Sequence, residues 1–367
     1  MTLLGLMSGT SMDGLDCLLV NLTLTPEYHF EYELIDFQTI PYDGATKKII
    51  RAALQEDDVA RARAHSHLGK VFADSSLEFL QGRKVLAAGS HGQTVDHEDG
   101  VFTLQVGDPS PLAQALQAPV VHDFRTADIR AGGNGAPLVP FLDWLLFRNS
   151  NRDTITLNLG GVANISHIPP QADRMEVSGF DTGPGMGLID EWVQMHWQCP
   201  MDKNGGFSKL GSVNESLLNE LMTHPFIKKT PPKSTGRHEF GLEFLVEIQG
   251  HHTCLSPEDV LRTLVGFTAK SVSENIVKFL KLFGYTGQVI LSGGGSHHPV
   301  LKADLEQYLH PIAVTNSLSV GLDPDCKEAL LIATLTSARL NEIPANMPTV
   351  TGAKMNTILG NIELYYK

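Results

Sequence analysis

Residues 5–16 read GLMSGTSMDGLD, and they are the part of the chain whose residue types point most directly to chemistry. They form a turn rich in glycine and hydroxyl groups between two apolar stretches. Glycine lets backbone N–H groups approach an anion closely, and Ser8, Thr10 and Ser11 add donors that a two-residue hairpin does not need. The pattern predicts a strand, a loop and a second strand that hold phosphate.

Two carboxylates in this loop, Asp13 and Asp16, need their own explanation, because they repel phosphate unless a divalent cation lies between or one of them acts as a base. The alternative is a solvated hairpin, since serine, aspartate and glycine favour turns for conformational reasons alone. The length of the loop and the near-continuous apolar strands around it favour the phosphate interpretation. The single Gly-Lys pair, at 69–70, is followed by Val71, which excludes a P-loop NTPase.

The composition sets the class of protein. The chain has 367 residues, of which 42% are hydrophobic and 19% charged, so it has room for two globular domains. A net charge of -13 argues against nucleic acid or an anionic membrane as the main partner. Four cysteines without C-x-x-C spacing favour a reducing compartment, and we expect the cytoplasm. We also expect neither an export leader nor a membrane span, since no run of 18 apolar residues occurs.

The middle of the chain contains a glycine-dense stretch at 131–137, which predicts a hinge or a close backbone approach. We place a domain boundary there, with a first lobe at 1–130, a second at 131–346 and a C-terminal segment at 347–367 that returns to the first lobe. Residues 154–166 repeat the opening pattern of strand, glycine turn and strand. Two similar halves that face each other across a ligand cleft are therefore expected.

Helical patterns alternate with these strands. Ser256 and Pro257 begin a stripe of apolar residues that extends to Phe279, and similar patterns cover about 60–81 and 326–340. The segment 289–296, VILSGGGS, predicts a buried strand that ends in three glycines before a helix at about 299–309. This alternation predicts an α/β fold.

Residues 179–185, GFDTGPG, hold one carboxylate, Asp181, among residues that continue neither a strand nor a helix. It could form an Asx turn, or it could act as a general base for a water or a substrate hydroxyl, which we favour. Residues 90–94, SHGQT, follow a predicted strand and suit the hydroxyls or the amide of a sugar, although a polar loop has the same composition.

Arg125 lies between Asp123 and Asp128, a spacing that fits either a structural ion pair or a clamp for a carboxylate or phosphate. Glu328 lies in the first turn of the last long predicted helix, where a carboxylate favours the helix dipole without any further role.

Taken together, the motifs resemble the anhydro-N-acetylmuramic acid kinase family over essentially the whole chain. The motifs that carry the resemblance are GLMSGTSMDGLD at 5–16, SHGQT at 90–94, DFRTAD at 123–128, GAPLVP at 135–140, GFDTGPG at 179–185, PKSTGR at 232–237, GGG at 293–295, KEA at 327–329 and PTVTGA at 348–353.

The resemblance implies an actin, Hsp70 and sugar-kinase type of fold, which is ribonuclease H-like, with duplicated mixed-sheet α/β lobes around an ATP cleft. It also implies the reaction, in which water opens the 1,6-anhydro bridge of anhydro-N-acetylmuramic acid while O6 receives the γ-phosphoryl group of ATP. N-acetylmuramic acid 6-phosphate is then formed during peptidoglycan recycling. By motif match, Asp181 is the base that activates this water.

The resemblance further implies ATP with Mg²⁺ and a homodimer. The magnesium ligands stay open, although Asp13 and Asp16 are interpreted as partners of the ion or of its waters. The implied ATP contacts are Gly9, Thr10, Ser11, Met12, Asp13, Gly14, Leu15, Asp16, Gly160, Gly161, Gly293, Gly294 and Gly295. The implied sugar contacts are Ser90, His91, Gln93, Arg125 and Glu328, with Arg125 meeting the lactyl carboxylate.

Three departures from the family pattern bear on substrate and adenosine contacts: Met186 follows the GPG turn, Asn134 replaces a common glutamine, and His297-His298 follows the triple glycine. Two rival functions remain at this stage. One is a kinase of another anhydro-sugar such as levoglucosan, and the other is an ATP-driven conformational switch of the same fold.

Overall fold

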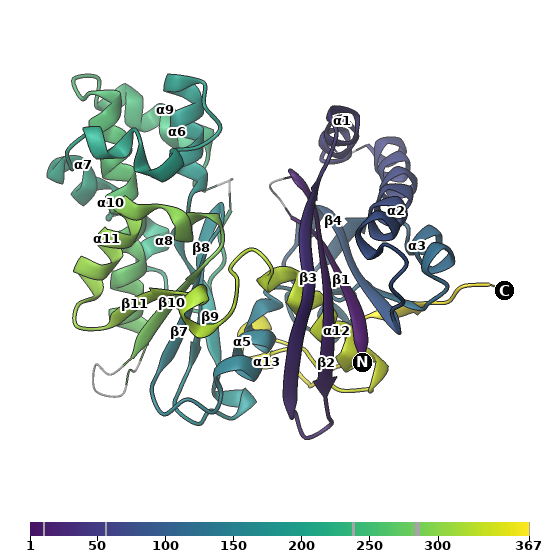
Figure 1. Cartoon of the computed structure of the whole chain (residues 1–367). Coiled ribbons are helices and arrows are strands. Elements are labelled where there is room, and N and C mark those ends of the chain that lie inside the picture. Colours follow the sequence, from purple (N-terminus) through teal and green to yellow (C-terminus); the bar gives the residue numbers. More distant parts are fainter. Residues whose placement is uncertain (10–11, 56, 237–238, 281, 283–286, 367) are drawn as a thin grey trace. The chain divides into compact units, whose positions relative to one another are not determined.

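The computed structural model describes residues 1–9, 12–55, 57–236, 239–280, 282 and 287–366. Its contacts group into two compact units, one formed by Met1–Leu146 with Cys326–Lys367 and the other by Phe147–Asp325. Each unit contains one mixed sheet with helices packed on it (Figure 1), which confirms the predicted α/β fold. The expected lobe boundaries after residues 130 and 346 stay a prediction.

The sheet of the first unit has the strand order β12-β6-β4-β1-β2-β3, with β5 paired to β4. β1 pairs antiparallel with β2 and parallel with β4. The predicted opening hairpin is therefore confirmed, and β1 is a central strand. The strands are β1 (Thr2–Ser8), β2 (Gly14–Leu24), β3 (Phe30–Pro41), β4 (Ala87–Glu98), β5 (Phe102–Val106), β6 (Val120–His122) and β12 (Asn361–Glu363).

Helices cover both faces of this sheet. The apolar side chains of Leu4 and Leu6 share a core with α1, α2 and α3, whereas α12 lies against the other face. A Cβ on Gly89 would clash with Thr336 Oγ1 of α12, which shows how closely this helix approaches β4. The helices are α1 (Gly44–Ala53), α2 (Asp58–Leu80), α3 (Pro109–Leu116), α4 (Thr126–Arg130), α5 (Val139–Phe147), α12 (Lys327–Leu340) and α13 (Pro348–Thr351).

The sheet of the second unit has the order β11-β10-β7-β8-β9. β7 pairs antiparallel with β8 and parallel with β10, and β8 pairs antiparallel with β9. The second predicted hairpin is thereby confirmed. The strands are β7 (Thr154–Leu159), β8 (Val162–Ile168), β9 (Ser178–Pro184), β10 (Gln288–Ser292) and β11 (Ala313–Asn316).

The two sheets share one topology. The five strands β6-β4-β1-β2-β3 match β11-β10-β7-β8-β9 in order and in the direction of every pairing, with only the second strand of each half antiparallel to the rest. This is the ribonuclease H-like arrangement. The duplication predicted from two similar hairpins is therefore present over five strands.

The helices of the second unit follow their sequence signals. The side chain of Ser256 caps α10 by accepting a hydrogen bond from Asp259 N at 3.1 Å, as predicted. The helices are α6 (Gly187–Trp197), α7 (Glu215–Leu221), α8 (Pro225–Lys228), α9 (Leu242–His251), α10 (Pro257–Phe279) and α11 (Pro299–Leu309). Across the described residues of both units, no helix has the length and apolar character needed to cross a membrane.

Candidate active site

Three predicted segments meet in the second unit at one end of its sheet. Gly185 N and Met186 N, which follow Asp181 on β9, donate to Gly161 O at 3.1 Å and to Gly160 O at 2.7 Å in the β7–β8 turn. Gly293 at the end of β10 has φ +75° and approaches Leu159, so a Cβ there would lie 3.0 Å from Leu159 O. The structure thus brings the two glycine turns and the segment of the proposed base together.

The Asp181 carboxylate is half-buried and is held by the segment that follows α8. Its Oδ2 accepts hydrogen bonds from Thr235 N at 2.9 Å and from Ser234 Oγ at 3.2 Å. The Asp181 backbone N–H donates to Lys233 O at 3.1 Å. Three successive residues therefore fix both the backbone and the side chain of Asp181. Residue-by-residue reasoning missed this role, because 232–237 entered only as a family motif.

Lys233 anchors this segment from within the core. Its Nζ is buried and donates to Phe226 O at 3.0 Å and to Ile227 O at 3.3 Å. It also lies 4.7 Å from the Phe226 ring centroid and 5.2 Å from that of Phe279. Among the described residues no carboxylate forms an ion pair with it, and burial lowers the pKa of Lys233 to about 8.

In the first unit, a buried chain of hydrogen bonds lies beneath the predicted phosphate loop. Ser8 Oγ donates to Gln93 Oε1 at 2.7 Å and, having spent its one proton, accepts from Tyr42 Oη at 2.7 Å. Gln93 is 1% exposed and lies opposite Ser8 in the parallel pairing of β1 with β4. The strand pairing thus places the 90–94 motif beside the loop, and Tyr42 is a contributor that the sequence did not indicate.

The described part of the loop is held at both ends. Met12 N donates to Gly9 O at 3.2 Å, and Tyr42 N donates to Asp13 O at 2.9 Å. Thr10 and Ser11, both predicted to contact ATP, lie outside the described residues.

The loop carboxylates fit the chemistry of a magnesium site. Asp13 is exposed, and Asp16 is half-buried with its Oδ1 accepting from Thr39 Oγ1 at 2.5 Å. In the described ranges no cluster of three or more histidine, cysteine, aspartate or glutamate side chains could hold a metal. Magnesium usually binds through one or two carboxylates, with waters and phosphate oxygens as its other ligands, so such an ion does not require a larger cluster of side chains.

Arg125 is oriented by neutral groups. Its Nε donates to His91 Nε2 at 3.1 Å and its Nη1 donates to Gly135 O at 2.9 Å. His91 Nδ1 lies 2.9 Å from Gly92 O, so the imidazole proton is on Nδ1 and the lone pair of Nε2 faces the guanidinium. Burial, together with the charge of Arg125, lowers the pKa of His91 to about 3. Burial lowers the pKa of Arg125 to about 10, which still leaves it charged at neutral pH.

The ion-pair alternative for Arg125 is wrong. Neither Asp123 nor Asp128 forms an ion pair with Arg125 in the described part of the chain. Asp123 accepts a hydrogen bond from Thr126 N at 3.1 Å, and Asp128 accepts one from Gly135 N. The carboxylates that interact electrostatically with Arg125 are instead Glu328, in the first turn of α12, and Asp99. Burial raises the pKa of Glu328, and the cations Lys327 and Arg125 oppose that rise.

Asp128 organises the glycine-dense stretch. Fully buried, it accepts from Gly135 N at 2.9 Å through Oδ2 and from Asn346 Nδ2 and Thr351 Oγ1 at 2.8 and 2.9 Å through Oδ1. Gly135 has φ +74° and supplies the carbonyl that Arg125 contacts. The glycines at 131–137 therefore allow a close backbone approach, one of the two predicted readings, and Asp128 supports Arg125 through Gly135.

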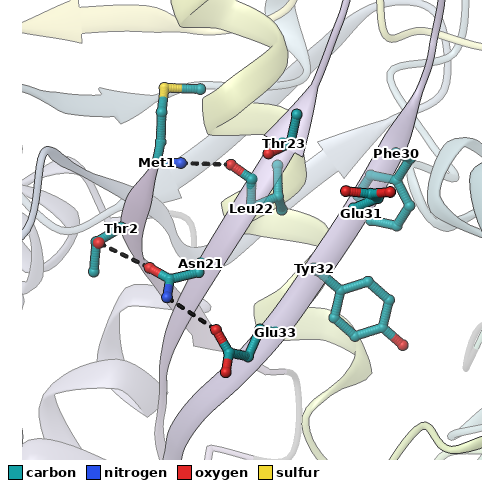
Figure 2. Close-up of a pocket in the computed structure, with 9 residues that line it drawn as sticks. All are labelled: Met1, Thr2, Asn21, Leu22, Thr23, Phe30, Glu31, Tyr32 and Glu33. Carbon is teal, nitrogen blue, oxygen red and sulfur yellow. Dashed lines mark hydrogen bonds between the residues drawn. The ribbon is translucent and has the colours of Figure 1, made fainter.

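A surface hollow on the first unit is separate from these residues. Figure 2 shows it at the start of β1, lined also by β2 and β3. Met1 N donates to Leu22 O at 2.7 Å there, and Asn21 Nδ2 donates to Glu33 Oε2 at 3.1 Å. Because the phosphate loop follows the other end of β1, this hollow contains none of the candidate site residues.

Comparison with known proteins gives one consistent family. The family model described as anhydro-N-acetylmuramic acid kinase matches residues 1–367. A protein named anhydro-N-acetylmuramic acid kinase from Bacillus cereus (strain ZK / E33L) is 37% identical over 378 residues, which cover 99% of each chain. A protein of the same name from Bacillus thuringiensis subsp. konkukian (strain 97-27) is 36% identical over 378 residues, with the same coverage.

Solved structures show more distant likenesses. An activator of 2-hydroxyisocaproyl-CoA dehydratase from Clostridium difficile with bound ADPNP has a TM-score of 0.45 at 13% identity, covering 93% of this chain and 96% of its own. A ROK family glucokinase from Streptomyces griseus in complex with glucose and AMPPNP has a TM-score of 0.42 at 10% identity, covering 91% and 99%.

Proposed function

Because the chain belongs to the anhydro-N-acetylmuramic acid kinase family, which makes it a sugar kinase, we propose that it uses ATP and water to convert 1,6-anhydro-N-acetylmuramic acid into N-acetylmuramic acid 6-phosphate. Water attacks C1, the bond from C1 to the bridging O6 breaks, and O6 takes the γ-phosphoryl group while ADP leaves. Such a reaction serves peptidoglycan recycling. The observation that carries this proposal is a glycine-flanked carboxylate, Asp181, held by Thr235 N within a family match over residues 1–367.

Asp181 is the proposed general base. As the C1–O6 bond lengthens, charge builds on O6 and makes the ether oxygen a better nucleophile toward phosphorus. Removal of a proton from the attacking water by Asp181 promotes that bond breaking, so the two transfers assist each other. The contacts from Thr235 and Ser234 hold the carboxylate in one orientation, which reduces the reorganisation needed during the reaction.

Backbone groups of the glycine turns are the proposed phosphate and nucleoside contacts. Residues 9–16 are the proposed contacts of the β- and γ-phosphates, and Gly160 and Gly161 are proposed to contribute N–H groups to the nucleotide. Residues 293–295 bind along the nucleoside. Asp13 and Asp16 hold Mg²⁺, which when bound neutralises charge on the phosphates.

The sugar contacts are proposed to centre on Arg125 and Glu328. Of the five N–H donors of a guanidinium, Arg125 uses two for His91 and Gly135, which leaves three for a ligand carboxylate such as the lactyl group. Glu328 with its raised pKa suits a sugar hydroxyl. Ser90, His91 and Gln93 are buried, and we assign them to this site mainly through the groups they support.

The test is Asp181→Asn in the intact protein, with Glu247→Gln on the exposed surface of α9 as the carboxyl-to-amide control. We expect Asp181→Asn to bind ATP normally but to form sugar phosphate at least about 100-fold more slowly, the usual size of a general-base contribution. Mass spectrometry in ¹⁸O water should place the label at C1 and the phosphate on O6 of the wild-type product. Activity of Asp181→Asn within a few-fold of wild type would exclude this base.

The two alternative functions are distinguished by the response of the protein to different anhydro-sugars. Faster turnover of levoglucosan than of anhydro-N-acetylmuramic acid would move the proposal to another anhydro-sugar. ATP hydrolysis that no anhydro-sugar changes would favour a conformational switch instead. We also propose a cytoplasmic homodimer, which light scattering coupled to size exclusion would test for its oligomeric state.

A further inference from the structure

A row of polar side chains crosses the sheet of the second unit at one level. Strand register pairs Ser292 on β10 with Asn158 on β7, Asn158 with Asn164 on β8, and Asn164 with Asp181 on β9. Residues paired directly across neighbouring strands point to the same face of a sheet. The proposed base is therefore the last member of a row that contains two primary amides.

This row lies on the face opposite the apolar core of the unit. The residues next to it along the strands, such as Leu157, Ile165 and Phe180, all belong to that core. In β7, β8 and β9, Asn158, Asn164 and Asp181 are half-buried amid mostly buried neighbours. An amide at such a position is enclosed enough to require partners and open enough for a small ligand or a water to reach it.

The two asparagines make no side-chain hydrogen bonds within the part of the chain that the structure describes, in contrast to Ser292, whose Oγ donates to Leu157 O at 3.5 Å. A half-buried amide without a protein partner costs free energy unless water or ligand satisfies it. Such an amide directly opposite the proposed base, at Asn164, therefore indicates a built polar site beside Asp181.

Resting on the proposed function, we propose that Asn164 orients the water that Asp181 activates. Side chains directly opposite on antiparallel strands have Cβ atoms about 5 Å apart, so one water can contact both. Asn164 Oδ1 accepts one water proton and Asp181 accepts the other. The oxygen lone pair is then directed at C1, where the new C–O bond forms as the C1–O6 bond breaks and Asp181 takes up the proton.

Asn158 provides the matched control. It lies in the same row with similar exposure, but it is one strand further away, about 10 Å from Asp181 at a strand spacing of about 4.8 Å. It is adjacent to Gly293, where a Cβ would meet Asn158 Oδ1. It is therefore out of reach of a water that contacts Asp181, although it lies beside a proposed nucleotide turn.

The experiment compares wild type, Asn164→Leu and Asn158→Leu in the intact protein with anhydro-N-acetylmuramic acid, ATP and Mg²⁺. Asn164→Leu should lower kcat about 100-fold, the effect of misplacing a reacting group, with ATP affinity within threefold of wild type. Asn158→Leu should keep kcat within about fivefold, whatever it does to ATP affinity. Wild-type kcat in Asn164→Leu, or a fall in its ATP affinity as large as the fall in kcat, would overturn the proposal.

Asn164→Asp keeps the test decisive if the leucine variant does not fold. Its carboxylate still accepts a water proton, but two adjacent carboxylates raise the apparent pKa of the pair. The acid limb of its kcat profile should therefore shift to higher pH, and an unshifted limb would contradict a shared water. Failure of the proposed function is distinguishable, because wild type itself would then not turn over the anhydro-sugar.

Discussion

Arg125 donates its Nε–H to the unprotonated Nε2 of His91 at 3.1 Å, so a neutral imidazole orients this guanidinium. A carboxylate in the same place would hold the group equally well but would cancel its charge. The low pKa of His91, about 3, means that the imidazole stays neutral throughout the physiological range. The pair therefore combines a fixed orientation with a positive charge that remains available to a ligand.

Replacing the imidazole acceptor should weaken sugar binding. His91→Phe keeps a planar ring but leaves Arg125 Nε without its acceptor, and hydrogen bonds to charged groups contribute about 1.5–3 kcal/mol. We expect the KM for the anhydro-sugar to rise at least about tenfold, while the KM for ATP stays within twofold. Steady-state kinetics with each substrate varied in turn measures both values.

The control for this variant is His29→Phe, just before β3, where the exposed histidine contacts Glu31. It should leave both KM values near wild type. Equal effects of the two variants would mean that the His91 contact does not position Arg125.

Activity should fall as pH rises through about 8, because Lys233 loses its proton there. Deprotonation removes the cation that anchors the segment holding Asp181. The effect on stability has the opposite sign. The pKa of Lys233 is lower in the folded protein than in the unfolded chain, so between about pH 8 and 10.5 the unfolded chain binds more protons. The free energy of unfolding therefore increases as the pH rises through this range. Loss of activity without loss of stability is the expected signature in paired kinetic and urea-unfolding profiles.

Lys233→Arg separates this effect from other titrations, since arginine keeps its proton at alkaline pH. The alkaline limb of the pH–activity profile of this variant should shift to higher pH by at least one unit. A limb that stays near pH 8 in this variant would assign the titration to another group.

Asp128→Asn should destabilise the first unit and loosen the sugar site together. An amide retains one acceptor oxygen but presents N–H groups toward the donors of Gly135, Asn346 or Thr351, which should cost about 2–3 kcal/mol. Urea unfolding measures the stability, and the KM for the anhydro-sugar reports the displacement of Gly135 O. Asp123→Asn, at a half-buried cap, should cost less than about 1 kcal/mol. A stability of Asp128→Asn equal to that of wild type would contradict the proposed support.

Strand and turn chemistry made much of this fold predictable. Two glycine turns between apolar strands predicted both hairpins, and the capping signal at Ser256 predicted the start of α10. These signals are local, because each arises from neighbouring residues whose backbone preferences agree. The glycine-flanked sequence around Asp181 also marked this residue, but the irregular turn predicted there is wrong, because Ser178–Pro184 form strand β9 and pair with β8.

The contacts that the sequence did not predict depend on strand register and on residues far apart in the chain. Tyr42 reaches Ser8, and Asn164 lies opposite Asp181, only because particular strands pair in one register. Likewise, the position of Arg125 between two aspartates suggested an ion pair, whereas Asp128 accepts hydrogen bonds from Gly135 and Thr351 instead. Sequence proximity identifies possible partners, but the tertiary fold decides among them.

The first unit is assembled from both ends of the chain, with α12 covering β1 and β4 from a segment that begins at Lys327. During synthesis, the ribosome therefore releases residues 1–146 long before the helix that seals one face of their sheet. Residues 147–325, which form the second unit, are continuous in sequence. One apolar face of the first unit's sheet therefore stays uncovered in the nascent chain until α12 has been synthesised, and such a transiently exposed apolar surface favours aggregation.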